Sequence, residues 1–376
     1  KINAKIGTNY QLFNYYGAPD ADRVIVAMGS VCDTIQETVD FLNARGEKVG
    51  MVKVHLYRPF SAKHLLAALP ETVKHISVLD RTKEPGSLGE PLFLDVVAAL
   101  KGSAFNDVPV YGGRFGLGSK DTVPAHIIAV YNNMVAPQPK PEFTLSIEDD
   151  VTHLSLPVTE NPDTTPAGTT SCKFWGLGSD GTVGANKDSI KIIGDNTDMF
   201  AQGYFFYDSK KSGGITVSHL RFGSSPITST YLINKANFVA CHCPSYVTKY
   251  DMVQDLVPGG TFLLNCIWTP DQLDSQLPAS MKRYIAENNI HFYIINGIQI
   301  AEEVGLPGRA STILQSAFFA ISGILPVEKA IELMKAAVVK KFSKKGEAVV
   351  NANFAGIDRG AQEIVKVDVP DSWKTA

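Results

Sequence analysis

A glycine-rich stretch near the middle of the chain has the residue types and spacing of a phosphate-binding turn. Gly176, Gly178 and Gly181 follow an apolar run, precede a helical pattern and have the spacing G-x-G-x-x-G. Glycines at these positions let the backbone turn sharply after a strand and approach a diphosphate closely. The following helix would direct unpaired N–H groups and the positive end of its dipole at the ligand. The sequence therefore predicts an anion at this turn.

The residues beyond the turn bear on which anion it is. Residues 204–207 are β-prone, and Asp208 follows them, where a NAD-binding fold usually places an acid. Lys210 and Lys211 come soon afterwards, and two cations beside such a turn suit a phosphorylated ribose better than a bare one. The alternative is that the glycines only pack the helix closely on the strand while the lysines are solvated, since this motif alone is weak.

Strands and helices that could position the turn follow from the hydrophobic periodicity. The first part of the chain alternates strand patterns with helix patterns, which predicts a small doubly wound α/β unit. Its expected strands are 23–30, 49–56 and 75–79, and its expected helices are 34–45 and 60–69.

A second, larger α/β sheet is expected from about residue 154 onwards. Beside the strands next to the glycine turn, strands are expected at 216–222, 238–243, 261–264 and 291–295, and helices at 252–257, 280–288, 310–324 and 327–342. The tail at 344–360 has little periodicity and predicts a loop with one short helix. The fold class is thus α/β, with two doubly wound, mainly parallel sheet domains. Residues 135–157, with prolines at 137, 139 and 141, predict a Pro-rich linker between them.

Composition excludes several partners. The net charge of −3 and the lack of a long basic run argue against nucleic acid, and no apolar stretch is long enough to span a membrane. Five irregularly spaced cysteines do not form a disulfide framework, so we expect a reduced, cytoplasmic protein. Because the sequence opens with Lys1 rather than Met, we expect a piece of a longer chain.

No pattern in the chain indicates a complete catalytic site. There is no nucleophile elbow, Walker loop or HExxH pair, so we assign no catalytic residue. Cys241-His-Cys243 has no second ligand pair and is read as a packed strand end, with a metal as the alternative. The charged loop at 80–90 is either a solvated turn or an interface held by Arg58, Arg81 and Glu84.

Several longer motifs resemble one enzyme family, the pyruvate:ferredoxin (flavodoxin) oxidoreductases. The resemblance covers essentially the whole chain. It is carried by the sequences at 58–61, 78–86, 112–118, 173–187, 208–214 and 218–223, which include Arg58-Pro-Phe-Ser61 and Gly112-Gly-Arg-Phe-Gly-Leu-Gly118.

The resemblance implies a thiamine-diphosphate enzyme, a homodimer as a whole. It converts pyruvate and coenzyme A into acetyl-CoA and CO2 and passes electrons through iron–sulfur clusters to ferredoxin or flavodoxin. Residues 1–140 resemble the transketolase C-terminal-like α/β domain, and 141–376 the gamma-type domain related to coenzyme A. The thiamine diphosphate, its Mg and the clusters would belong to the remaining domains, the partners of this piece. The piece would then be inactive alone.

The resemblance and the turn together give a candidate coenzyme A site. Its residues are Gly176, Gly178, Ser179, Asp180, Gly181, Thr182, Lys187, Lys210, Lys211, Arg309 and Asn353. The family often shows Arg-x-Asn where this chain has Arg309-Ala-Ser311, and Asn353 is expected in the tail loop. The alternatives are scaffold domains without a ligand and an NAD(P)-binding dehydrogenase.

Overall fold

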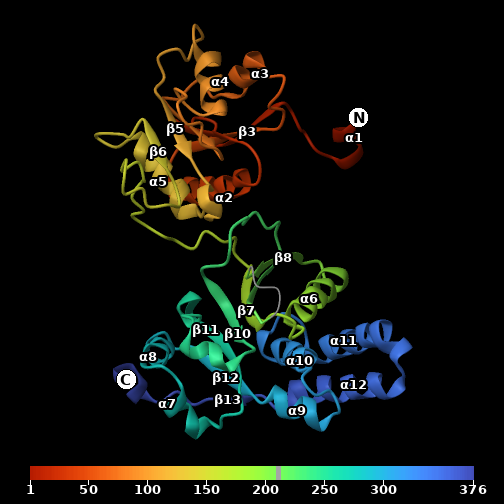
Figure 1. Ribbon diagram of the computed structural model, residues 1–376. Coiled ribbons are helices and arrows are strands. Elements are labelled where there is room, and N and C mark those ends of the chain that lie inside the picture. The colour runs from red at the N-terminus through yellow and green to blue at the C-terminus, as the bar shows by residue number, and fades with distance from the viewer. Residues whose placement is uncertain (209–212) are drawn as a thin grey trace. The chain divides into compact units, whose positions relative to one another are not determined.

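A computed structural model describes residues 1–208 and 213–376 (Figure 1). The chain forms two compact units. The first consists of Lys1–Thr165 with Thr228–Tyr231, and the second of Pro166–Ile227 with Leu232–Ala376. Each unit has its own mainly parallel sheet, so the fold class predicted from the sequence is confirmed.

The sheet of the first unit has, among the described residues, six strands in the order β1-β3-β2-β4-β5-β6. All neighbours pair in parallel except β1, which is antiparallel to β3. The strands are β1 (Phe13–Gly17), β2 (Arg23–Ala27), β3 (Val49–Val54), β4 (His75–Asp80), β5 (Val110–Arg114) and β6 (Glu142–Thr144).

Helices cover both faces of this sheet, because β2 and its neighbours are apolar on both sides. α2 and α5 pack on one face through residues such as Ile35 and Tyr131, and α3 and α4 on the other through Leu65 and Leu92. The helices are α1 (Ile2–Ile6), α2 (Val31–Ala44), α3 (Ala62–Ala68), α4 (Pro91–Leu100), the 3-10 turn η1 (Leu117–Ser119) and α5 (Pro124–Met134).

The sheet of the second unit has seven strands within the described part of the chain, in the order β13-β12-β11-β10-β7-β9-β8. β12, β11, β10 and β7 are parallel, whereas β9, β8 and β13 pair antiparallel. The strands are β7 (Thr170–Leu177), β8 (Phe200–Tyr207), β9 (Ile215–Gly223), β10 (Ala236–Cys241), β11 (Leu256–Asn265), β12 (His291–Ile295) and β13 (Val365–Lys366).

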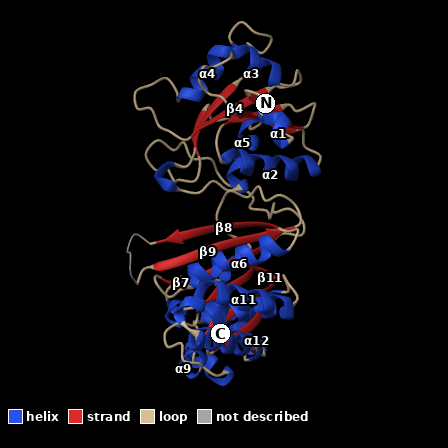
Figure 2. Cartoon of the chain, turned by 90° about the vertical axis from the view of Figure 1, so that its right-hand side faces the viewer, coloured by secondary structure: helices blue, strands red, loops and turns tan. Residues whose placement is uncertain are grey.

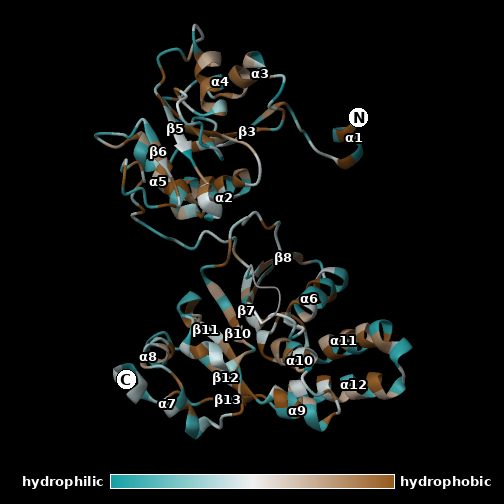
Figure 3. Ribbon diagram, in the orientation of Figure 1, coloured by the Kyte–Doolittle hydropathy of each residue, from teal (hydrophilic) through white to brown (hydrophobic). Residues whose placement is uncertain are grey.

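Two apolar cores enclose the second sheet. One contains Phe174 and Phe318 and lies under α6 and α10 to α12; the other contains Phe262 and Met281 and lies under α8. Figure 2 draws α6 beside β8 and β9, and Figure 3 shows hydrophobic and hydrophilic residues alternating along α11. The helices are α6 (Thr182–Asn196), α7 (Leu273–Gln276), α8 (Ala279–Glu287), α9 (Gly297–Glu303), α10 (Ser311–Ser322), α11 (Val327–Phe342) and α12 (Glu347–Gln362). The 3-10 turns are η2 (Pro244–Thr248), η3 (Val253–Asp255), η4 (Pro270–Gln272), η5 (Ser343–Lys345) and η6 (Asp371–Thr375).

The segment expected to be a linker contributes a strand instead. β6 pairs with β5, and Phe143 is fully buried against Gly113, whose missing side chain leaves room for the ring. The prolines precede this strand and do not interrupt it, because proline is tolerated at a strand's beginning. The first unit therefore continues to Thr165, beyond the boundary at residue 140 expected from the sequence.

Two expected elements differ in the second unit. Residues 252–257 do not form a helix, because the chain makes only the turn η3 before β11 begins at Leu256. The tail, expected to be a loop with one short helix, is helical over most of its length, since α12 is a regular helix of 16 residues. Its buried face includes Gly356 and Gly360, which lie close to Ile313 of α10, so close backbone packing replaces the apolar stripe that would have indicated a helix.

A buried carboxylate organises part of the first unit. Glu37 of α2 is only 3% exposed and accepts hydrogen bonds from the hydroxyls of Thr164 (2.6 Å), Ser229 (2.5 Å) and Tyr231 (2.6 Å). Burial and the nearby carboxylate raise the pKa of Tyr231 to about 12, so its hydroxyl stays a donor. Glu37 therefore holds residues 228–231 in this unit.

Replacing Glu37 by alanine should destabilise the first unit. Each buried hydroxyl left without its acceptor costs about 1–3 kcal/mol, so we expect a melting temperature lower by roughly 5–10 °C. The matched control is Glu160→Ala, which breaks the partly exposed pair with Arg45 and should cost less than about 1 kcal/mol. Equal melting temperatures of the two variants in differential scanning calorimetry would contradict this role of Glu37.

Candidate functional site

The predicted glycine turn joins β7 to α6 as the sequence analysis expected. Ser179 and Gly181 have the positive φ angles 79° and 90°. Glycine adopts such angles readily, which explains its presence at position 181. The N–H of Gly178 donates to the carbonyl of Gly214 (2.7 Å), and a Cβ at Gly178 would lie 3.1 Å from that oxygen. The next strand along the chain, β8, is separated from β7 by β9. The backbone is therefore closely packed at the turn, as the motif predicts. The strand order around it differs from that of a dinucleotide-binding fold, because an antiparallel strand lies between β7 and β8.

The turn's own acid takes some of its backbone donors. The Asp180 carboxylate accepts from the N–H groups of Leu177 (2.9 Å) and Thr182 (2.8 Å). The N–H groups of Ser179, Gly181, Val183 and Gly184 have no acceptor among the described residues. Because these groups lie in the turn and the first helical turn, they form a cradle for an anion.

A pocket of about 560 Å³ lies over this cradle. It is lined by Leu177, Gly178, Ser179, Asp180, Gly181, Val183, Gly184, Tyr207, Asp208, Gly214, Ile215 and Thr216. The charged side chains among these residues are the acids Asp180 and Asp208. A phosphate bound here would need cations from elsewhere, and the candidates Lys210 and Lys211 lie outside the described residues.

A second helix begins next to the turn. A Cβ at Gly181 would lie 2.7 Å from Oγ of Ser311, the first residue of α10. The N–H groups of Ser311, Thr312 and Ile313 also find no acceptor in the described part of the chain. The positive ends of two helix dipoles therefore meet here. A further pocket of about 590 Å³ starts at Gly181 and Ser311 and is lined by α6 and α11.

The other predicted site residues lie apart from the cradle. Lys187 is exposed with its ammonium 5.3 Å from the ring centroid of Phe205, and Arg309 is exposed in the loop before α10; neither lines these two pockets. Asn353 is buried in α12, not in a loop, and its Oδ1 lies 3.5 Å from the hydroxyl of Thr312. Asn353 therefore contacts the start of α10 through the side chain of Thr312, and it does not line the pocket over the cradle.

His242 is also part of the site, although no sequence motif pointed to it. Its Nδ1 lies 2.7 Å from Oγ1 of Thr182, and its N–H donates to the carbonyl of Trp175 (2.8 Å). Burial lowers the pKa of His242 to about 4, so the ring is neutral. The signal that could have found it is its place near the C-terminal end of the predicted strand 238–243, at the sheet edge where the turn lies. Beside it, Cys241 is packed in the core, with its thiol donating to the carbonyl of Cys243 (3.1 Å).

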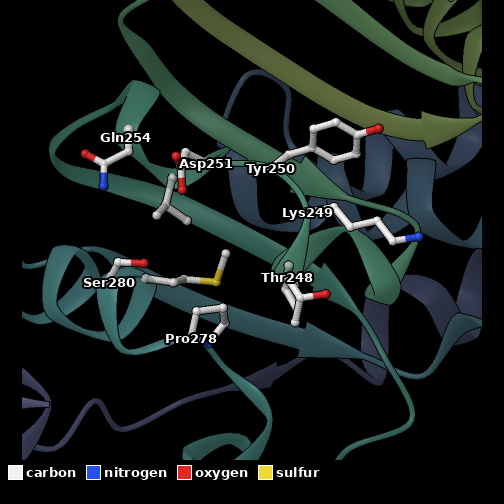
Figure 4. A pocket seen from close by; sticks show the side chains of 10 residues that line it. Thr248, Lys249, Tyr250, Asp251, Gln254, Pro278 and Ser280 are labelled. Atoms are coloured by element: carbon white, nitrogen blue, oxygen red, sulfur yellow. The ribbon is translucent and has the colours of Figure 1, made fainter.

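A smaller pocket of about 170 Å³ lies between η2, η3 and α8 (Figure 4). Lys249 and Asp251, its charged lining residues, are both exposed. In Figure 4 the side chains of Lys249 and Tyr250 extend away from Pro278 and Ser280. This pocket is also much smaller than the pocket of about 560 Å³ over the cradle, so the cradle is the stronger candidate site.

The fold and the cradle define a two-unit α/β chain with a nucleotide-type glycine turn. The model of the family described as "Pyruvate ferredoxin/flavodoxin oxidoreductase" matches residues 171–363, and that of "Pyruvate:ferredoxin oxidoreductase core domain II" matches residues 21–127. The chain belongs to the pyruvate:ferredoxin/flavodoxin oxidoreductase family, a family of 2-oxoacid oxidoreductases.

Relatives match along the full chain. It is 58% identical over 375 residues to the pyruvate-flavodoxin oxidoreductase of Enterobacter agglomerans, covering 100% of this chain and 32% of the relative. It is 56% identical over 370 residues to the pyruvate:ferredoxin oxidoreductase of Moorella thermoacetica, covering 98% and 32%. The chain therefore spans about a third of the length of these relatives.

One similar solved structure is the 2-oxoglutarate:ferredoxin oxidoreductase from Magnetococcus marinus, with 2-oxoglutarate, coenzyme A and succinyl-CoA bound. It shares 17% identity over 54% of this chain and 32% of that chain, with a TM-score of 0.40. None of the helices in the described residues is both long and apolar enough to cross a membrane.

Alanine at Gly181 should distort the cradle, whereas alanine at Gly184 should not. The positive φ of Gly181 costs an L-residue about 1–2 kcal/mol, and the new Cβ would meet Ser311. Gly184 has nothing within 4 Å of its Cβ position and lies inside α6, so alanine should stabilise the chain by up to about 1 kcal/mol. Urea unfolding measures both free energies, and equal values for the two variants would contradict this geometry.

Proposed function

We propose that the cradle binds the phosphates of coenzyme A. The observation that carries this proposal is the set of N–H groups from Ser179, Gly181, Val183 and Gly184 that line one pocket without an acceptor among the described residues. The adjoining start of α10 adds a second set of such donors. Backbone donors at helix starts bind phosphate oxygens without bringing a full charge of their own.

The proposed roles of the turn residues follow from their hydrogen bonds. Gly178 and Gly181 line the pocket and let the backbone approach the ligand, and Ser179 offers its N–H. Gly176 has no side chain that would collide with Thr182, and so lets the turn close tightly. Asp180 and Thr182 hold the turn in shape, because the Asp180 carboxylate is already bonded to the backbone and the Thr182 hydroxyl to His242.

Cations must balance the ligand's charge. Coenzyme A carries a diphosphate and a ribose 3′-phosphate, and the described pocket lining supplies acids instead. We therefore assign the 3′-phosphate to Lys210 and Lys211, which follow the lining residue Asp208 in the sequence. Lys187 and Arg309 add to the positive potential without lining the pocket. Asn353 supports the start of α10 through Thr312.

The proposal extends to the whole protein of which this chain would be about a third. That enzyme would oxidise pyruvate with coenzyme A to acetyl-CoA and CO2 and pass electrons to ferredoxin or flavodoxin. Thiamine diphosphate, Mg and iron–sulfur clusters would be held by other domains, and the whole would be a homodimer. The first unit would act as the transketolase C-terminal-like domain and the second as the gamma-type domain. The chain alone would not be catalytic, and its free cysteines fit the reducing cytoplasm.

One observation also fits a nicotinamide dinucleotide. Asp208 follows β8 and lines the pocket, in the place from which dinucleotide folds bind a ribose hydroxyl. However, β9 separates β8 from β7, whereas those folds place the two strands side by side. Because one observation favours a dinucleotide and the other disfavours it, the binding experiment compares coenzyme A with NADP+.

Calorimetric titration of the chain with coenzyme A tests the proposal. Binding should be saturable, and Gly178→Val should weaken it at least tenfold, because the new side chain enters the pocket near Gly214. The matched control is Gly194→Ala on the far end of α6, where the new Cβ makes an ordinary 3.9 Å contact with Ala201. No binding of coenzyme A, or tighter binding of NADP+, would overturn the proposal.

The charge assignment has its own test. Replacing Lys210 and Lys211 by alanine should weaken coenzyme A roughly tenfold or more, since each charge-assisted bond is worth about 1.5–3 kcal/mol. Dephospho-coenzyme A, which lacks the 3′-phosphate, should bind the wild type and the double variant alike. A double variant that binds coenzyme A as tightly as the wild type refutes the assignment.

A further inference from the structure

His242 contacts both ends of the glycine turn. Its backbone N–H donates to Trp175 (2.8 Å), directly before Gly176, and its ring Nδ1 bonds to Oγ1 of Thr182 (2.7 Å), directly after Gly181. One residue thus spans the loop of residues 176–181 from outside. Neither the glycine motif nor the Cys241-His-Cys243 pattern indicates this link.

His242 is itself held in place from two further directions. Its carbonyl accepts from Nδ2 of Asn265 (2.9 Å), and Oδ1 of Asn265 accepts from the N–H of Gly297 at the start of α9 (3.0 Å). The ring packs edge-on against Phe174, with centroids 6.2 Å apart. His242 therefore connects the ends of β7, β10 and β11 with the start of α6.

The ring is unsuited to act as a cation or a ligand contact. Its Nε2 is buried and has no partner among the described residues, and His242 does not line the pocket over the cradle. Because burial lowers its pKa to about 4, the ring carries no charge near neutral pH. Its effect on an anion must therefore pass through Thr182 and Trp175.

We propose that His242 is a positioning residue for the anion cradle. By bonding to Trp175 and Thr182 it fixes the gap between the end of β7 and the start of α6. It thereby also fixes the directions of the N–H groups of Gly181, Val183 and Gly184, for which the described residues supply no acceptor. This inference deepens the proposed coenzyme A site and rests on it. A cradle fixed before binding loses less conformational entropy when the ligand arrives.

The test compares coenzyme A binding to the full chain in variants on both sides of the bond. His242→Leu and Thr182→Val each remove it and should weaken binding roughly tenfold, the size of one buried hydrogen bond with its partner left unpaired. His242→Asn should stay within about threefold of wild type, because the asparagine side chain can place a hydrogen-bonding atom near the Nδ1 position. The double variant His242→Leu/Thr182→Val should bind no more weakly than either single variant, since both lose the same bond. Fully additive losses, or wild-type affinity in His242→Leu, would overturn the inference.

Hydrogen exchange gives a readout that needs no ligand. Without His242 the start of α6 should open more often, so amides of residues 176–190 should exchange about tenfold faster in His242→Leu and unchanged in His242→Asn. Residues 327–342 of α11 serve as the internal reference. Unchanged exchange at 176–190 refutes the positioning role even if coenzyme A binds. If the wild type fails to bind coenzyme A, the proposed function falls, and the exchange data still decide whether His242 holds the cradle.

Discussion

The candidate site depends on the parallel pairing of β7 with β10. Trp175 pairs with Cys241, the last residue of β10. His242 therefore leaves the sheet beside Gly176 and Leu177, the last two residues of β7, which lead into the turn. Parallel pairing brings strand ends of the same kind to one edge, and the chain can therefore close the turn with a residue far away in sequence. Asn265 at the end of β11, the next strand along, continues the same set of bonds.

In both units an aspartate at or after the end of a strand accepts hydrogen bonds from N–H groups at the start of the next helix, but the number of N–H groups it occupies differs. In the first unit Asp80 is the last residue of β4, and its carboxylate accepts from the N–H groups of Leu92 and Phe93 at the start of α4. Pro91 has no N–H, and the N–H of Leu94 donates to the Glu90 carbonyl. The first four residues of α4 therefore leave no backbone N–H for an anion. Asp180 accepts from one N–H of α6, that of Thr182, and the N–H groups of Val183 and Gly184 have no acceptor within residues 1–208 and 213–376. The proposed anion site therefore lies in the second unit and not at this edge of the first.

Helices from the end of the chain complete the cradle. α10 lies close to α12 because Gly356 and Gly360 have no side chains facing Ile313. α10 is also tied to α6 by Gln315, whose Nε2 donates to the Ala185 carbonyl (3.1 Å) and to the Ser189 hydroxyl (2.9 Å). These contacts bring Ser311 against Gly181, although the two residues lie about 130 positions apart in the sequence. The packing of α10 therefore determines where the second helix start of the site lies.

The sequence by itself determined the α/β class, the glycine turn and the family, because hydrophobic periodicity and short motifs act over neighbouring residues. It missed β6 and α12, since one follows prolines and the other packs through glycine rather than through an apolar stripe. Only the tertiary structure brought His242 to Thr182 and Ser311 to Gly181. Only it showed the Asp180 carboxylate bonded to the backbone N–H groups of Leu177 and Thr182. Contacts between distant segments depend on sheet order and helix packing, which no local pattern encodes.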